Sequence, residues 1–266
     1  MAGPFFELIP YCAALAFVCW LLSVLTREYS WVDRIWSIAP PVYLWAMAAR
    51  TGFEAPRLTL MAALATAWGA RLTFNYARKG GYAKGGEDYR WGVLRSRMSP
   101  ALFQVFNATF IAPYQNALIF LLTAPGNAAA LHPSPLGAAD VALAALFLAL
   151  LALETVADQQ QWNFHQAKKA RAARGESGPR FCTTGLFRYS RHPNFVCEVG
   201  QWWVMFGFAV VAAGTPWQWT AAGAVLLTLL FDGSTRFTEG ITRSRYAEYA
   251  EYQAKTSRLL PWFPRA

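Results

Sequence analysis

Long apolar stretches separated by short polar segments constrain this chain more than any other feature of its sequence. A helix needs about 20 apolar residues to cross the hydrocarbon core of a bilayer. The apolar stretches predict seven spans, over about residues 5–25, 36–50, 58–77, 101–124, 136–157, 194–213 and 217–235. Because a backbone in lipid must satisfy its hydrogen bonds internally, the expected fold class is all-α, a polytopic bundle of seven transmembrane helices.

The second of these stretches differs from the others. It is short and contains Pro40 and Pro41. Proline removes a backbone donor, so the pair predicts a broken or kinked helix. Such a break is tolerated where neighbouring helices or a cavity satisfy the freed backbone groups.

The placement of positive charge predicts the orientation of the bundle. If the N-terminus is outside, 21 of the 24 Lys and Arg residues fall in the segments on the cytoplasmic side. The positive-inside rule therefore favours an outside N-terminus and a cytoplasmic C-terminus. The net charge of +9 does not suggest a nucleic-acid partner, because the cations lie in short segments between apolar runs rather than in a basic stripe on a polar face.

The rest of the chain suggests a single membrane domain over residues 1–266. No internal repeat or linker divides it, and the first apolar stretch lacks the basic leader and cleavage site of a signal peptide. The four cysteines have neither CxxC nor zinc spacing, so neither a disulfide framework nor a metal site is expected. Residues 241–256 carry three tyrosines at helical spacing and predict a helix on the cytoplasmic face, followed by an aromatic anchor, LLPWFP.

Polar residues at the end of the third stretch form the first candidate site. Arg71 is followed one turn later by Asn75 and about two turns later by Arg78, on nearly the same helix face. This face would bind an anionic group. The alternative is an interfacial cluster whose side chains extend towards the cytoplasm.

The fifth stretch ends in a second polar group. Glu154 and Asp158 are spaced i, i+4 and lead into Gln159, Gln160, Gln161 and Asn163. Carboxylates and amides of this kind suit ribose hydroxyls or amide donors. The alternative is a polar helix end that meets water.

The most informative segment is FCTTGLFRYSRHPNFVCEVGQWW, residues 181–203. A loop with Arg188, Arg191 and His192 leads through Pro193 into an apolar helix. Near its start this helix contains three polar residues, Asn194, Glu198 and Gln201. A helix N-terminus surrounded by basic groups is a natural phosphate site, and proline is favoured in a first helical turn.

This segment resembles the steroid 5-alpha-reductase family. GLFRYSRHPNF, followed by Glu198 and Trp202, is similar to the family's glycine-leucine-phenylalanine, asparagine-phenylalanine, glutamate and tryptophan pattern, and the similarity extends to Pro261. The chain looks closest to the bacterial branch of this membrane reductase superfamily. The resemblance implies a seven-helix membrane fold in a bacterial inner membrane, with NADPH bound on the cytoplasmic side by the half of the chain from about residue 136 to 266.

The resemblance also assigns roles to individual residues. Asn194, Glu198 and Trp202 would contact nicotinamide and ribose, and residues 188–192 would contact phosphates. Together with Asn75 and Asn163 from the two polar groups described above, the predicted cofactor-binding residues are Arg71, Asn75, Arg78, Asp158, Asn163, Arg188, Tyr189, Arg191, His192, Asn194, Glu198, Trp202, Arg236 and Tyr246.

The N-terminal half departs from the family pattern. The family's catalytic glutamine-glutamate pair aligns with Asp33 and Arg34, and its third-helix tyrosine falls near Trp68. The reaction implied is hydride transfer from NADPH to an enone of an apolar substrate entering from the bilayer, with a 3-oxo-4-ene steroid favoured. An acid must then polarise the substrate carbonyl, and the candidates are Asp33, Tyr76 and Tyr114. For Asp33, an ion pair with Arg34 or Arg27 is the structural alternative.

Two other functions remain open at this point. Membrane methyltransferases of the isoprenylcysteine carboxyl type, which use S-adenosylmethionine, also carry an Arg-His-Pro string, a following helix and a C-terminal acidic-tyrosine segment. Arg191, His192 and Pro193 fit that pattern too. A non-enzymatic protein that binds or transports lipid is the third possibility, although no inverted pair of broken helices is evident.

Overall fold

The computed structural model describes residues 3–265, and these residues are all-helical, with no strand among them. The predicted all-α fold class is thereby confirmed. The chain divides into two compact units. Unit 1 contains the chain up to Ala145 together with Trp202–Leu226, and unit 2 contains Leu146–Gln201 and the chain from Leu227 onward.

Four helical stretches in the described part of the chain are long and apolar enough to cross a membrane. They are Phe6–Thr26, Pro100–Leu131, Ala138–Ala173 and Pro193–Ala213. Each overlaps one of the seven predicted spans, and together they support an integral membrane protein. The count of seven spans and the orientation of the termini stay predictions.

The N-terminal part of unit 1 explains why the second predicted span is short. After the turn η1 (Phe6–Leu8), α1 (Ile9–Thr26) ends at Arg27, whose backbone is left-handed with φ of 58°. A short helix α2 (Trp31–Ile35) precedes α3 (Ala39–Arg50), which has 12 residues. Pro40 and Pro41 lie in the first turn of α3, where a missing backbone N–H breaks no helical bond. The prolines therefore mark the start of the helix, and α3, at about 18 Å, is shorter than the bilayer core.

The next helix, α4 (Pro56–Arg78), packs against α3. Its Gly69 allows a close approach to the chain before α3, because a Cβ atom there would lie 2.3 Å from the Ser37 carbonyl oxygen. With 23 residues α4 has the length to span a bilayer, but arginines interrupt its apolar composition.

The predicted span over 101–124 is irregular. Two short helices, α5 (Tyr89–Ser96) and α6 (Pro100–Phe106), precede a π-helical segment, η2 (Asn107–Tyr114). This segment contains Pro113, which cannot donate a backbone hydrogen bond and so disrupts the regular α-helical pattern. The chain continues through α7 (Gln115–Leu121) and α8 (Pro125–Leu131), and α8 packs on both α3 and α4.

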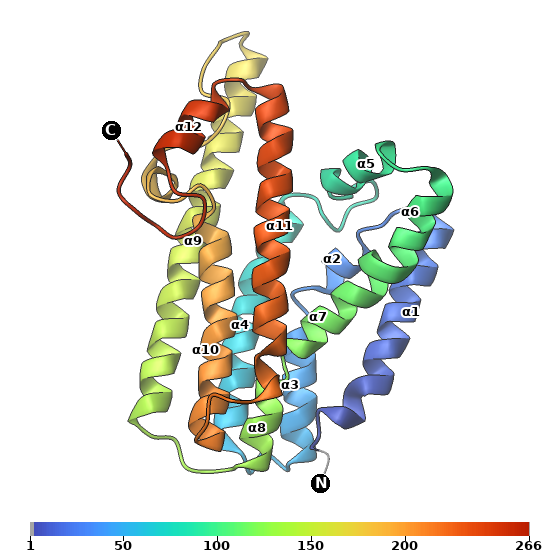
Figure 1. Cartoon of the computed structure of the whole chain (residues 1–266), viewed down its shortest axis with the longest axis vertical. Coiled ribbons are helices and arrows are strands. Elements are labelled where there is room, and N and C mark those ends of the chain that lie inside the picture. Colours follow the sequence, from blue (N-terminus) through green and yellow to red (C-terminus); the bar gives the residue numbers. More distant parts are fainter. Residues whose placement is uncertain (1–2, 266) are drawn as a thin grey trace. The chain divides into compact units, whose positions relative to one another are not determined.

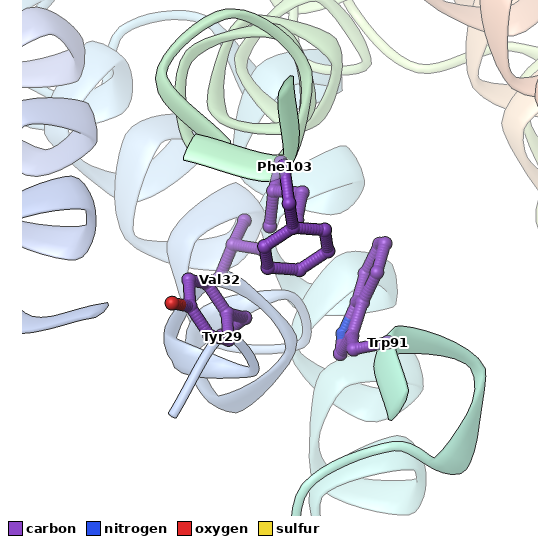
Figure 2. Packing of buried hydrophobic residues seen from close by; sticks show 5 residues of the cluster. Tyr29, Val32, Trp91 and Phe103 are labelled. Carbon is purple, nitrogen blue, oxygen red and sulfur yellow. The ribbon is translucent and has the colours of Figure 1, made fainter. Parts of the chain in front are cut away.

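An aromatic cluster joins α2 to α5 and α6 within unit 1. Figure 2 shows the rings of Tyr29, Trp91 and Phe103 around Val32. Tyr29 and Phe103 meet edge to face at 4.7 Å, and the Tyr29 hydroxyl accepts a hydrogen bond of 2.8 Å from Gln104. This packing fixes the segment on which Asp33 lies.

Figure 1 shows three long helices, α9 (Ala138–Ala173), α10 (Pro193–Ala213) and α11 (Ala222–Arg245), and each of them contributes residues to both units. Helix α9 has 36 residues, far more than the stretch 136–157 predicted as a span. At 1.5 Å per residue it is about 54 Å long, so its polar C-terminal part extends beyond a bilayer core of about 30 Å. Two turns, η3 (Gly185–Arg188) and η4 (Trp219–Ala221), complete the connections.

The predicted helix over 241–256 is divided in two. Its first residues belong to α11, and the rest form α12 (Tyr249–Lys255) after a turn. The turn lets Tyr249 and Tyr252 pack on the ring of Phe181, at centroid distances of 4.9 and 5.7 Å. Burial of these rings outweighs the continuous helical pattern of the sequence.

A buried ion pair in unit 1 provides a test of this packing. Arg57 at the start of α4 donates to both carboxylate oxygens of Asp140 in α9, at 2.6 and 3.0 Å, and the two residues are only 4% and 1% exposed. Asp140→Asn removes the charge that compensates Arg57, and we expect it to lower the stability of the detergent-purified protein by about 3–5 kcal/mol, measured by denaturation.

The matched control is Glu7→Gln, which removes the partner of Arg50 from an ion pair whose side chains are 31% and 62% exposed. We expect this change to cost only about 0–1 kcal/mol. Equal stabilities for the two variants would show that the Arg57–Asp140 pair does not hold unit 1 together.

Candidate functional site

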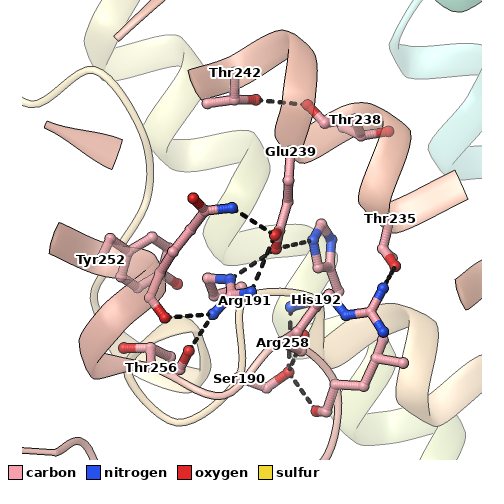
Figure 3. A network of polar contacts seen from close by, with 12 residues as sticks. Ser190, Arg191, His192, Thr235, Thr238, Glu239, Thr242, Tyr252, Thr256 and Arg258 are labelled. Atoms are coloured by element: carbon pink, nitrogen blue, oxygen red, sulfur yellow. Dashed lines mark hydrogen bonds and ion pairs between the residues drawn. The ribbon is translucent and has the colours of Figure 1, made fainter. Parts of the chain in front are cut away.

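The carboxylate of Glu239 lies at the centre of a hydrogen-bond network in unit 2 (Figure 3). Glu239 is in α11 and only 4% exposed. It accepts hydrogen bonds from Arg191 at 2.7 and 3.0 Å, from the ring of His192 at 2.9 Å and from the amide of Gln253 at 2.8 Å. Burial by itself raises the pKa of Glu239, but these hydrogen bonds outweigh it and lower the pKa to about 2.

Arg191 also ties the loop before α10 to the C-terminal segment. Its Nη1 donates to the carbonyl of Gln253 at 3.0 Å and to that of Thr256, and its backbone N–H donates to Ser257 at 2.9 Å. Four of the five N–H donors of the Arg191 guanidinium are thus engaged with protein groups. In this conformation Arg191 and His192 anchor the loop, and their contact with phosphates stays a prediction.

Arg188 has the opposite character. It is exposed, and within residues 3–265 its guanidinium has no hydrogen-bond or ion-pair partner. A free cation on this loop is available to an anionic group in a way that Arg191 is not. Its neighbour Tyr189 is also partly exposed, and its ring packs edge to face on Phe263 at 6.0 Å.

The glycine of the GLF string has a geometric role. Gly185 has φ of 63°, and a Cβ atom there would lie 2.5 Å from the side-chain amide of Gln160 in α9. The Gln160 oxygen accepts the backbone N–H of Leu186 at 2.9 Å. Phe187 then packs against Ala157 and Cys182. The loop is thus held against α9 by a backbone hydrogen bond from Leu186 and by the side chain of Phe187.

Two polar contacts link α9 to α10 inside unit 2. Gln201 donates to Glu154 at 2.7 Å, and Asn194 donates to Asp158 at 3.3 Å. Glu154, Asp158 and Gln201 are 2%, 5% and 0% exposed, and Glu198, one turn before Gln201, is 7% exposed. The polar residues predicted at the end of the fifth stretch and at the start of the sixth are therefore brought together, in a setting where burying them is costly.

Three other predicted cofactor-binding residues lie apart from these contacts. Asn163 is on the exposed side of α9 and accepts from Gln159 at 2.7 Å. Arg236 pairs with Asp232 at 2.9 Å, with its side chain 69% exposed. Tyr246 accepts a hydrogen bond from Lys168 at 3.3 Å, and the Arg180 guanidinium lies over its ring at 5.3 Å. Their role at a cofactor stays a prediction.

Asp33 in unit 1 does not form the ion pair considered for it. Its carboxylate accepts the indole N–H of Trp91 at 3.0 Å, whereas Arg34 pairs with Glu28 at 2.6 Å. Burial raises the pKa of Asp33 above its ordinary value, and the hydrogen bond from Trp91 opposes this effect. A carboxyl with a raised pKa is suited to hold a proton.

Tyr76 is linked to the same region. Its ring meets Tyr82 edge to face at 5.0 Å, and the Tyr82 hydroxyl donates to the Arg34 carbonyl at 3.2 Å. The Tyr76 hydroxyl is buried and has no hydrogen-bond partner among the described residues. The Tyr114 ring is stacked on Phe110 at 4.8 Å. Tyr76 is thus linked through Tyr82 to the backbone next to Asp33, and the catalytic role of all three candidates stays a prediction.

The remaining predicted residues of unit 1 are on α4 and α10. Arg78 donates to the Asn75 oxygen at 2.8 Å, so these two side chains share one face of α4, and Arg71 is partly buried on the same helix. Trp202 packs edge to face on Trp68 at 4.9 Å. Both indole N–H groups are buried and have no hydrogen-bond partner in the described part of the chain.

Comparison with known proteins identifies the family. The family model described as "Protein of unknown function (DUF1295)" matches residues 19–256. This chain belongs to the DUF1295 family. The family is associated with steroid 5-alpha-reductase-like membrane proteins.

One relative of this DUF1295 chain is a Schizosaccharomyces pombe (strain 972 / ATCC 24843) protein named "Uncharacterized protein C594.04c". The two are 37% identical over 260 residues, which cover 92% of this chain and 76% of the yeast protein. No solved structure matches the chain at a significant level.

Sequence reasoning missed several residues that hold the DUF1295 site together. Glu239 and Gln253 lie far along the chain from the loop they bind, and Gln160 and Trp91 carry no motif of their own. One signal was available for Glu239, since it precedes the tyrosine-rich segment in a stretch otherwise rich in Thr and Arg. Nothing in the sequence paired it with Arg191.

The Glu239 network predicts a specific pH dependence. Because the folded-state pKa of about 2 is below the ordinary 4.5, the carboxylate contributes stability above pH 4.5 that is lost as the pH falls from about 4.5 to about 2. We expect Glu239→Gln to reduce stability near neutral pH by about 2–3 kcal/mol. The difference in melting temperature between wild type and variant should shrink across the same acid range.

Glu251→Gln is the matched control, because Glu251 is an exposed carboxylate in α12. It should leave the melting temperature nearly unchanged at every pH. A Glu239→Gln variant that is as stable as wild type at neutral pH would contradict the assigned role of this carboxylate.

Proposed function

We propose that this DUF1295 chain is an NADPH-dependent membrane reductase of an enone carbon-carbon double bond in an apolar substrate, with a 3-oxo-4-ene steroid as the favoured substrate. The observation that carries the proposal is the buried polar contact between α9 and α10. It is formed by Glu154 and Asp158 of α9 with Asn194 and Gln201 of α10, the helix that directly follows the loop whose string resembles that of the reductases. Ionisable side chains inside apolar helices are expensive, so they mark functional sites.

The polar groups of unit 2 suit a dinucleotide. The side-chain oxygens of Gln161 and Gln201 are buried without a hydrogen-bond partner among the described residues, so they can accept from a carboxamide or a ribose hydroxyl. Arg188 is free to meet a phosphate. Asp158 and Asn194 offer a carboxylate and an amide at the same helix pair. These residues would hold the cofactor, which we place on the cytoplasmic side of a bacterial inner membrane.

Bound NADPH would supply the hydride. The chain's own task is then to deliver a proton to the substrate carbonyl oxygen and to exclude water. We assign the proton to Asp33, whose raised pKa favours the acid form, acting with Tyr76, whose hydroxyl has no protein partner in the described residues. The apolar substrate would enter from the bilayer, where such molecules concentrate.

A specific observation favours a second candidate, an S-adenosylmethionine-dependent methyltransferase of the isoprenylcysteine carboxyl type. Arg191 and His192 of the Arg-His-Pro string bind Glu239, and Arg191 also bonds to α12 and the chain after it. The Arg-His-Pro string and the C-terminal acidic-tyrosine segment are the two features shared with those methyltransferases. The Asn-Phe, Glu198 and Trp202 positions, by contrast, match only the reductase pattern.

Ligand-induced stabilisation separates the candidates. We expect NADPH to raise the melting temperature of the detergent-purified protein and S-adenosylmethionine to leave it unchanged, because only a ligand of the folded state stabilises it. Asn194→Ala should raise the NADPH concentration needed for a given rise in melting temperature at least tenfold. Gln166→Ala, at an exposed position of α9, should leave that concentration unchanged. Stabilisation by S-adenosylmethionine alone would favour the methyltransferase, and no response to either ligand would favour a lipid-binding protein.

The proton donor has a separate test. Asp33→Asn and Tyr76→Phe should each lower steroid turnover by about 10²-fold or more, while the NADPH-dependent melting shift stays as in wild type. Asparagine keeps an acceptor for Trp91, so the local packing should survive. Glu54→Gln, at an exposed position of unit 1, serves as the control and should retain activity. Full activity in both Asp33→Asn and Tyr76→Phe would remove these residues from the mechanism.

A further inference from the structure

The chain that follows α12 lines an open cavity of about 500 Å³ within unit 2. Its walls come from Arg191 and from residues between Gln253 and Arg265. Four of the lining residues are cations, Arg191, Lys255, Arg258 and Arg265, and none is a carboxylate. Arg191 is the one residue of this lining that also belongs to the predicted cofactor site.

Two of the four cations are neutralised and two are not. Arg191 pairs with Glu239 at 2.7 Å, and Arg258 pairs with Asp232. Lys255 and Arg265 are exposed, and the structure from residue 3 to residue 265 gives neither side chain an ion-pair partner. The cavity therefore carries an uncompensated positive charge, which favours an anionic ligand.

The same segment exposes three large apolar side chains. Leu260, Trp262 and Phe263 are 76%, 72% and 77% exposed. Apolar groups that protrude together from one short segment indicate a surface that meets something other than water. Tryptophan in particular is enriched where a protein meets the headgroup region of a bilayer.

Hydrogen bonds hold this segment close to the start of a candidate membrane span. Trp262 donates its N–H to the Tyr189 carbonyl at 3.0 Å, and the Ser190 hydroxyl donates to Leu259 at 2.6 Å. The apolar span of α10 begins at Pro193, only three residues after Ser190. The segment after α12 is thus held close to the point where a spanning helix enters the bilayer.

We propose that this cavity binds the phosphate headgroup of an anionic phospholipid, with Lys255 and Arg265 providing the charge and Leu260, Trp262 and Phe263 contacting the surrounding lipid. The group that the cavity would bind is a phosphate, and free inorganic phosphate offers the same group. The exposed apolar residues beside the cations favour the lipid as its source, because a soluble phosphate would leave them in water.

The test uses the full-length protein in detergent, titrated with phosphatidylglycerol or with phosphatidylcholine of the same acyl chains. We expect phosphatidylglycerol to raise the melting temperature at about tenfold lower concentration than phosphatidylcholine, and this preference to weaken as salt is added. Lys255→Gln combined with Arg265→Gln should abolish the preference. Native mass spectrometry should show correspondingly less retained phosphatidylglycerol.

The control is Lys169→Gln combined with Arg243→Gln, which removes the same charge from exposed positions of unit 2 outside the cavity. It should keep the wild-type preference. The proposal is overturned if the cavity variant prefers phosphatidylglycerol as strongly as wild type or if the control loses the preference equally. It is also overturned if inorganic phosphate or NADPH stabilises wild type through Lys255 and Arg265 in place of the lipid.

Discussion

The Glu239 carboxylate is the interaction on which the architecture of unit 2 depends. It lies on α11, yet it binds the loop before α10 through Arg191 and His192 and the end of α12 through Gln253. Burying a carboxylate or an arginine alone is unfavourable. Each of these two groups can be buried because the other one compensates its charge. Removing either partner would release both the loop and the C-terminal segment.

This clamp separates residues that hold the site from residues that can bind a ligand. The Arg191 guanidinium donates hydrogen bonds to Glu239, Gln253 and Thr256. Arg188 on the same loop is exposed, and its guanidinium has no protein partner in the described chain. Gly185 and Gln160 set the loop on α9, so Arg188 is presented from a supported backbone. The ligand site that we propose at Arg188 would be preorganised by contacts that do not themselves touch the ligand.

The sequence predicted the helical class and several of the spans well, because apolar stretches of bilayer length have few other structures open to them. It also identified Asp158 and Asn194 as polar residues in apolar helices, and the structure joins them at 3.3 Å. It could not predict that α9 continues to Ala173 or that the chain turns between α11 and α12. Helix ends of this kind depend on packing, here of Tyr249 and Tyr252 on Phe181, rather than on local preference.

By itself the sequence determined that the chain is helical and apolar enough for a membrane, and that a basic loop with a recognisable string precedes one of the spans. These properties follow from composition and spacing, which act over a few residues at a time. Only the tertiary structure decided that Arg191 meets Glu239, that Asp33 meets Trp91 instead of Arg34, and that the cations after α12 surround a cavity. Contacts between residues about 50 positions apart depend on how helices pack, and no local pattern in the chain records which carboxylate will face which cation.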